Sequence, residues 1–175
     1  MRILVAGVGN VLRTDDAFGV VVAQRLQGMD LPAGVTVVET GIGGMALVQE
    51  LQGLYDALIM VDAVDYGRTP GHVLLIEPDV IDVHALPPDA RSDLLADMHL
   101  AKPERVLMLA KALGVLPRHR LMVGCQPVDP DAYGTEMSPE VEAAVEVAIN
   151  EILSHIAELH RQEAAAVAGE ATATP

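Results

Sequence analysis

Short apolar runs alternate with amphipathic segments along most of the chain. Five of the runs have the length and composition of buried strands, and the segments between them carry apolar residues at helical spacing. This alternation predicts an α/β fold, a three-layer αβα sandwich in which a mostly parallel, five-stranded twisted sheet has helices on both faces. The predicted strands are residues 2–8, 35–39, 57–61, 72–76 and 121–125, and the predicted helices are 17–26, 45–54, 103–113 and one that begins at 139.

The connection between the third and fourth predicted strands is short. Residues 63–71 are too few for a crossover between parallel neighbours, which takes a dozen or more residues. We therefore predict that strand 72–76 pairs antiparallel with strand 57–61 as a hairpin. Residues 79–98 follow as a long mixed segment, which we interpret as a surface loop or lid.

The last predicted helix opens on a serine, a proline and a glutamate at 138–140. These residues offer a capping hydroxyl, a proline at the first helical position and an acid in the first turn. Residues 163–175 are low in complexity and lack an apolar stripe. We therefore predict a single domain over residues 1–160 and a disordered tail over 161–175.

Composition narrows the class of protein. Of the 175 residues, 51% are hydrophobic and 21% are charged, which excludes a disordered or fibrous chain. The net charge of −14 argues against nucleic acid or an anionic membrane surface as a partner. A single cysteine excludes a disulfide framework, and no apolar stretch approaches the roughly 20 residues of a membrane span. With no signal-peptide pattern at the start, we expect a soluble, cytoplasmic monomer.

Acidic residues follow the first and third predicted strands. Asp15 and Asp16 stand at the start of the first helix, where the helix dipole alone would also favour acids. Asp62 ends an apolar strand, at the sheet edge where ligand crevices form in α/β folds. An unpaired carboxylate is costly to bury, so Asp62 requires a cation, a metal or several hydrogen-bond donors. Asp65 lies further into the loop and is interpreted as a turn residue.

His99 follows the lid-like segment and precedes a helix. Because the first and third strands are neighbours in doubly wound sheets, Asp16 and Asp62 are expected to face one crevice. If the lid-like segment brings His99 to this crevice, the three residues form a set of two carboxylates and one imidazole, which suits nickel, zinc or manganese. Cys125 has no evident histidine partner and is interpreted as an inert thiol.

Together these residues resemble a known family, the hydrogenase maturation proteases, which are endopeptidases that trim the C-terminus of nickel–iron hydrogenase large subunits. The similarity extends from the first strand to about Leu159. The positions that carry it are residues 3–10, Leu12, Asp15, Asp16, Gly19, Asp62, His99, Leu107, Gln126, Pro127 and residues 137–141.

The resemblance implies a function and a site. Asp16, Asp62 and His99 would be the catalytic residues and the metal ligands. The metal would be nickel delivered by the substrate, the hydrogenase large-subunit precursor, with zinc or cadmium able to substitute in vitro. Two routes to cleavage stay open, a carboxylate acting as general base on water or the metal polarising the scissile carbonyl.

The turn after the second strand departs from the family pattern. Many members have an Asp-Gly-Gly-Thr-like turn that takes part in substrate recognition, whereas here residues 39–44 read Glu-Thr-Gly-Ile-Gly-Gly. The resemblance implies that Glu39, Gly41 and Ile42 bind substrate. Because Ile42 stands where threonine is common, the identity of the partner hydrogenase is left open.

Three other functions compete with this one. A receiver-like signalling module shares the acidic pair and the strand-ending aspartate, but it needs a lysine where this chain has Cys125 and Gln126. A non-catalytic, metal-sensing chaperone of the hydrogenase subunit would need the same metal ligands. A metal-dependent hydrolase of small substrates would use the same open crevice.

Overall fold

The computed structural model describes residues 1–87, 89 and 103–172. In this part of the chain, five strands form one sheet in the order β2-β1-β3-β5-β4. All neighbouring pairs are parallel except β4 with β5. The predicted α/β class and mostly parallel sheet are confirmed. The strands are β1 (Ile3–Val8), β2 (Val35–Gly41), β3 (Ala57–Ala63), β4 (Val73–Ile76) and β5 (His119–Cys125).

The fourth strand pairs with a different neighbour from the one that we predicted. β4 is antiparallel to β5, with Val73 opposite Cys125 and Ile76 opposite Met122, whereas β5 lies against β3. The predicted hairpin with β3 is therefore wrong, although the antiparallel direction is right. β5 pairs with all seven residues of the buried strand β3, and the more exposed β4 lies outside it.

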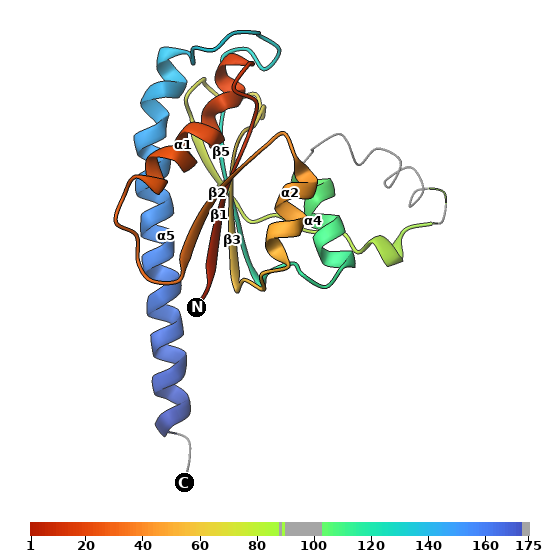
Figure 1. Cartoon of the computed structure of the whole chain (residues 1–175), viewed down its shortest axis with the longest axis vertical. Helices are drawn as coiled ribbons and strands as arrows, with labels where there is room; N and C mark the ends of the chain where they lie inside the picture. Colours follow the sequence, from red (N-terminus) through yellow and green to blue (C-terminus); the bar gives the residue numbers. More distant parts are fainter. Residues whose placement is uncertain (88, 90–102, 173–175) are drawn as a thin grey trace.

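Helices cover both faces of the sheet (Figure 1), as predicted. α1 (Phe18–Gln27) and α5 (Pro139–Thr172) pack on one face, and α2 (Gly44–Leu51) and α4 (Pro103–Ala112) pack on the other. The side chains of β1 alternate between the two cores, so that Ile3 faces α1 and α5 while Leu4 faces α2 and α4. Because both faces are covered, the strand is apolar throughout. Short 3-10 helices occur at η1 (Thr14–Ala17) and η2 (Val83–Ala85), and η2 is in the described part of the predicted loop or lid.

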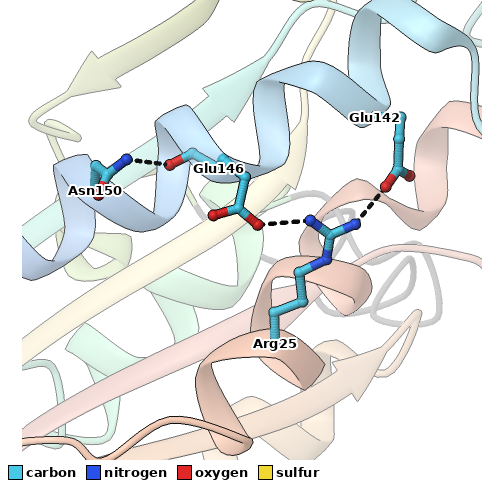
Figure 2. A network of polar contacts seen from close by, with 4 residues as sticks. All are labelled: Arg25, Glu142, Glu146 and Asn150. Carbon is cyan, nitrogen blue, oxygen red and sulfur yellow. Dashed lines mark hydrogen bonds and ion pairs between the residues drawn. The ribbon is translucent and has the colours of Figure 1, made fainter.

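An arginine joins the two helices on the first face (Figure 2). The Arg25 guanidinium on α1 lies between Glu142 and Glu146 of α5, with Nη1 2.7 Å from Glu146 Oε1. Asn150 donates to the backbone carbonyl of Glu146 at 2.9 Å. The ion pairs are solvent-accessible, so each contributes at most about 1 kcal/mol to stability.

Both ends of α5 differ from the sequence expectation. The Ser138 hydroxyl is buried without a hydrogen-bond partner among the described residues, so the predicted side-chain cap is wrong. The Ser138 carbonyl accepts from Glu142 N at 2.9 Å instead.

At its C-terminal end, α5 continues through Thr172 where we predicted a disordered tail, and Figure 1 shows the helix running past the sheet. Alanine-rich residues with high helix propensity follow Glu163. Glu163 itself lies 2.6 Å from the Met1 ammonium.

Candidate active site

The carboxyl ends of the parallel strands meet at one edge of the sheet, and Asp62 lies on this edge. It is the sixth residue of β3, still in register with Gly124 of β5. The side chain is only 7% exposed. The pKa of Asp62 is raised to about 7, mainly by burial, then by the negative charge of Asp16 and more weakly by that of Glu104. A hydrogen bond from Ala63 N acts in the opposite direction, because it favours the ionised form. The carboxyl group is therefore balanced between its protonated and ionised forms at neutral pH.

Asp16 comes from η1, the turn between β1 and α1. Burial also raises its pKa, while the charge of Arg13 and the backbone N–H of Asn10 act in the opposite direction. The negative charge of Asp16 is one cause of the raised pKa of Asp62, so the two carboxyl groups interact electrostatically. Gly9 allows the backbone of η1 to pack closely against the end of β1, because a Cβ at this position would lie 1.9 Å from the Asp16 carbonyl oxygen.

The structure shows a role for Asp15 that the sequence did not predict. Asp15 is 2% exposed and accepts backbone hydrogen bonds from Val128 N at 2.8 Å and Ser138 N at 2.7 Å. These bonds use both carboxylate oxygens. Asp15 is therefore a buried structural carboxylate, and Asp16 is the member of the pair whose charge raises the pKa of Asp62.

His99 lies outside the described residues. The chain re-enters the described part at α4, and Glu104 in the first turn of that helix is close enough to raise the pKa of Asp62. Glu104 was not predicted from the sequence, where its only signal is an acid in the first turn of a helix that follows a candidate histidine. Across residues 1–87, 89 and 103–172, no group of three or more His, Cys, Asp and Glu side chains is arranged to hold a metal.

A pocket of about 320 Å³ opens at the ends of β1 and β2. It brings together the three residues expected to bind substrate, with Ile42 65% exposed at its surface. Glu39 accepts a hydrogen bond from Gln24 Nε2 of α1 at 3.2 Å. The pocket is lined by Gly9, Asn10, Val11, Val20, Glu39, Gly41 and Ile42.

Two neighbouring residues behave as the sequence predicted. The Asp65 carboxylate accepts from Gly67 N at 3.1 Å, which makes it a turn residue. The Cys125 side chain is fully buried, and burial raises the pKa of the thiol to about 12. The thiol therefore stays protonated and is a poor nucleophile at neutral pH.

Gln126 directly follows β5 and is 5% exposed. The sequence pointed to this residue only through the family resemblance. Its side chain accepts from Tyr66 N at 2.9 Å and Arg68 N at 3.0 Å, and it donates to Asp65 Oδ1 at 2.9 Å. These contacts hold the loop that follows Asp62. A buried glutamine next to a proline carries no local pattern that would reveal this role.

Comparison with known proteins gives consistent results. A family model described as hydrogenase maturation protease matches residues 20–155, which include Asp62 and His99 and begin just after Asp16. The hydrogenase expression/formation protein HupD of Bradyrhizobium diazoefficiens is 33% identical over 150 residues, which are 85% of this chain and 74% of that protein. The hydrogenase 2 maturation protease of Escherichia coli is 31% identical over 160 residues, 90% of this chain and 92% of that protein.

Solved structures agree with these sequence relatives. The hydrogenase maturating endopeptidase HybD from E. coli superimposes with a TM-score of 0.71 at 28% identity, covering 90% of this chain and 93% of that one. A hydrogenase 2 maturation peptidase from a Thaumarchaeota archaeon gives a TM-score of 0.65 at 33% identity, covering 90% and 99%. No helix among the described residues is long and apolar enough to cross a membrane.

Proposed function

Because the chain belongs to the hydrogenase maturation protease family, we propose that it removes the C-terminal extension of a nickel-loaded hydrogenase large-subunit precursor. In this proposal the bound nickel of the substrate is the recognition element. The observation that carries it is the pair of carboxyl groups, Asp16 and Asp62, at the carboxyl edge of the sheet. We further propose that the protein acts as a cytoplasmic monomer, without a nucleic-acid or membrane partner.

Asp16, Asp62 and His99 are the proposed ligands of the substrate's nickel. Carboxylate oxygens and an imidazole nitrogen suit a divalent first-row metal, so zinc or cadmium is expected to occupy the same ligands in vitro. Burial and a neighbouring negative charge both disfavour an ionised Asp62 in the free enzyme. A divalent cation between the two carboxylates reverses this balance, because it favours the ionised form of both.

Both routes to peptide cleavage depend on Asp62. In the free protein the pKa of Asp62 is about 7, so a carboxylate that the nickel leaves unbound can accept a proton from an attacking water at neutral pH. If the carboxylate instead binds the substrate's nickel, Asp62 would help to hold the metal, which would supply polarisation of the scissile carbonyl. In either case the scissile bond must lie beside the nickel, which makes cleavage depend on a correctly loaded substrate.

The pocket at the ends of β1 and β2 is the proposed binding site for a segment of the precursor. Val11, Val20 and Ile42 give it apolar walls, and Glu39 provides one carboxylate. An extended segment that lies over Gly41 can place one side chain in this pocket while the neighbouring backbone continues toward Asp16. The exposed Ile42, in place of the common threonine, is expected to influence which precursor fits.

The test is cleavage of a nickel-loaded precursor, followed by gel mobility, with wild type, Asp62→Asn and Asp30→Asn. Asp30 is an exposed aspartate in the loop between α1 and β2, so the control makes the same chemical change away from the carboxyl edge. We expect Asp30→Asn to cut normally and Asp62→Asn to leave the precursor intact while still folded by circular dichroism. An Asp62→Asn variant with wild-type activity would remove this carboxyl group from the mechanism.

The non-catalytic chaperone remains the alternative because it would need the same ligands. It predicts a stable complex with the nickel-loaded precursor and no change in precursor mobility with wild-type protein. Cleavage by purified wild-type protein therefore separates the two functions.

A further inference from the structure

Residues 126–138 connect β5 to α5, and we name them the bridging loop. We propose that the bridging loop fixes the relative position of Asp16 and Asp62, with Asp15 and Gln126 as the positioning residues at its two attachments. The functional part of this inference rests on the proposed role of the carboxyl pair. Neither positioning residue is a proposed ligand of the metal.

The first attachment is to the turn that carries Asp16. The neighbouring residue, Asp15, accepts hydrogen bonds from Val128 N near one end of the bridging loop and Ser138 N at the other. Because the carboxylate is 2% exposed and the bonds are 2.8 and 2.7 Å long, these are buried, charge-assisted hydrogen bonds. One side chain thus fixes both ends of the loop to η1.

Backbone and side-chain contacts reinforce this attachment. Thr14 N donates to Gly134 O at 3.0 Å, and Gly134 N donates to Leu12 O at 3.1 Å. Arg13 lies 3.0 Å from Asp131 Oδ1 and stacks over the Tyr133 ring. Thr14 has a φ of 34°, an unfavourable backbone conformation for threonine that the surrounding contacts must hold in place. The conformation of η1 therefore depends on the bridging loop.

The second attachment is to the loop that carries Asp62. The Gln126 carboxamide oxygen accepts from both Tyr66 N and Arg68 N, and its amide nitrogen donates to Asp65. The Gln126 backbone adds two bonds at the entry to β4, from Gly71 N at 2.9 Å and to His72 O at 3.0 Å. The loop after Asp62 is thus held by a single buried residue of the bridging loop.

These contacts give the two carboxyl groups a common support. Asp16 and Asp62 come from different loops, so their separation depends on how those loops are held relative to each other. A shift of about 1 Å in a ligand-bearing loop is enough to impair metal binding or catalysis. The bridging loop contacts both loops through buried hydrogen bonds, and it carries no residue proposed to touch the metal.

Hydrogen–deuterium exchange of the free protein tests the coupling without reference to any metal. We expect Asp15→Asn to increase amide exchange in residues 64–71, and Gln126→Ala to increase it in residues 10–17. The side-chain hydrogen bonds described above join each residue to other segments. Arg25→Gln is the control, because it removes the ion pairs of Figure 2 between α1 and α5 and should affect only those helices. Increases confined to the mutated residue's own neighbours would overturn the proposal.

Titration with cadmium tests the consequence for the site. We expect Asp15→Asn and Gln126→Ala each to weaken cadmium binding by about 10–100-fold, as changes around metal ligands typically do. The double variant should lose less than the product of the two single effects, because both act through one loop. Arg25→Gln should bind as wild type does. Unchanged affinity in the two single variants would overturn the functional part of the proposal.

Failure of the proposed function gives a different result. In that case the wild type itself would leave a nickel-loaded precursor uncut, whereas the exchange result would be unaffected.

Discussion

Replacing Asp62 with asparagine should stabilise the free protein at neutral pH although it removes activity. Asp62 has a pKa of about 7 in the folded protein against an ordinary value of 3.8. At 1.36 kcal/mol per pKa unit, this difference corresponds to about 4 kcal/mol. This penalty lowers the free energy of unfolding at every pH at which Asp62 is ionised in the unfolded chain, because burial disfavours the ionised form in the folded protein.

The sign of the pH dependence follows from proton binding. Between pH of about 4 and about 7, Asp62 is protonated in the folded protein and ionised in the unfolded chain. The folded state then binds more protons, so its stability falls as the pH rises through this window and levels off above it. Below about pH 4 both states are protonated, and the penalty disappears.

Asparagine cannot ionise, so Asp62→Asn lacks this penalty at every pH. Its amide oxygen can still accept from Ala63 N, but its buried NH₂ group needs a new partner, which costs about 1–3 kcal/mol. We therefore expect the variant to be less stable than wild type at pH 4. At pH 8 we expect it to be more stable by about 1–3 kcal/mol, a rise in Tm of several degrees.

Urea unfolding at pH 4, 6 and 8 in the presence of a chelator measures the difference directly. Asp65→Asn is the matched control, because a hydrogen bond from Gln126 lowers the pKa of that exposed carboxyl group. Its replacement should cost stability at neutral pH, the opposite sign. A stability difference between wild type and Asp62→Asn that does not change with pH would show that the pKa of Asp62 is not raised in the folded protein.

Three further predictions concern the metal and the tail. Titration of the wild-type protein with cadmium or nickel should show one binding site, and the double variant Asp16→Asn, Asp62→Asn should lose it. The wild-type affinity should fall as the pH drops below about 7, because protons compete with the metal for Asp62. His99→Ala should keep the circular dichroism of the wild type and lose cleavage by more than 100-fold; full activity would exclude it as a ligand. Truncation after Glu163 should leave Tm within about 2 °C of wild type, since the shortened chain keeps the ion pair between Glu163 and the Met1 ammonium. A larger fall in Tm would show that the end of α5 contributes to stability.

The sequence predicted those parts of the fold that depend on local patterns. The continuous apolar composition of β1 and β3 and the helical spacing of α1 and α5 are local, and the structure confirms the elements that they predict. The predicted pairing of β4 with β3 was wrong. The short connection between these strands indicates that β4 runs antiparallel, but it does not determine which strand β4 pairs with. That choice depends on β5, which lies more than 40 residues further along the chain and pairs with the whole of β3.

The candidate site shows the same division. The position of Asp62 at the end of an apolar strand was enough to predict its place at the carboxyl edge of the sheet. The roles of Asp15 and Gln126 were not predictable, because each depends on hydrogen bonds to backbone groups about 60 or more residues away in sequence. Such contacts have no periodicity and no characteristic spacing.

Cleavage of nickel-loaded and nickel-free forms of the same large-subunit precursor by the wild-type protein tests the proposed function most directly. We expect the nickel-loaded form to lose its C-terminal extension and the nickel-free form to stay intact. Equal cleavage of both forms would show that Asp16 and Asp62 do not recognise the metal of the substrate.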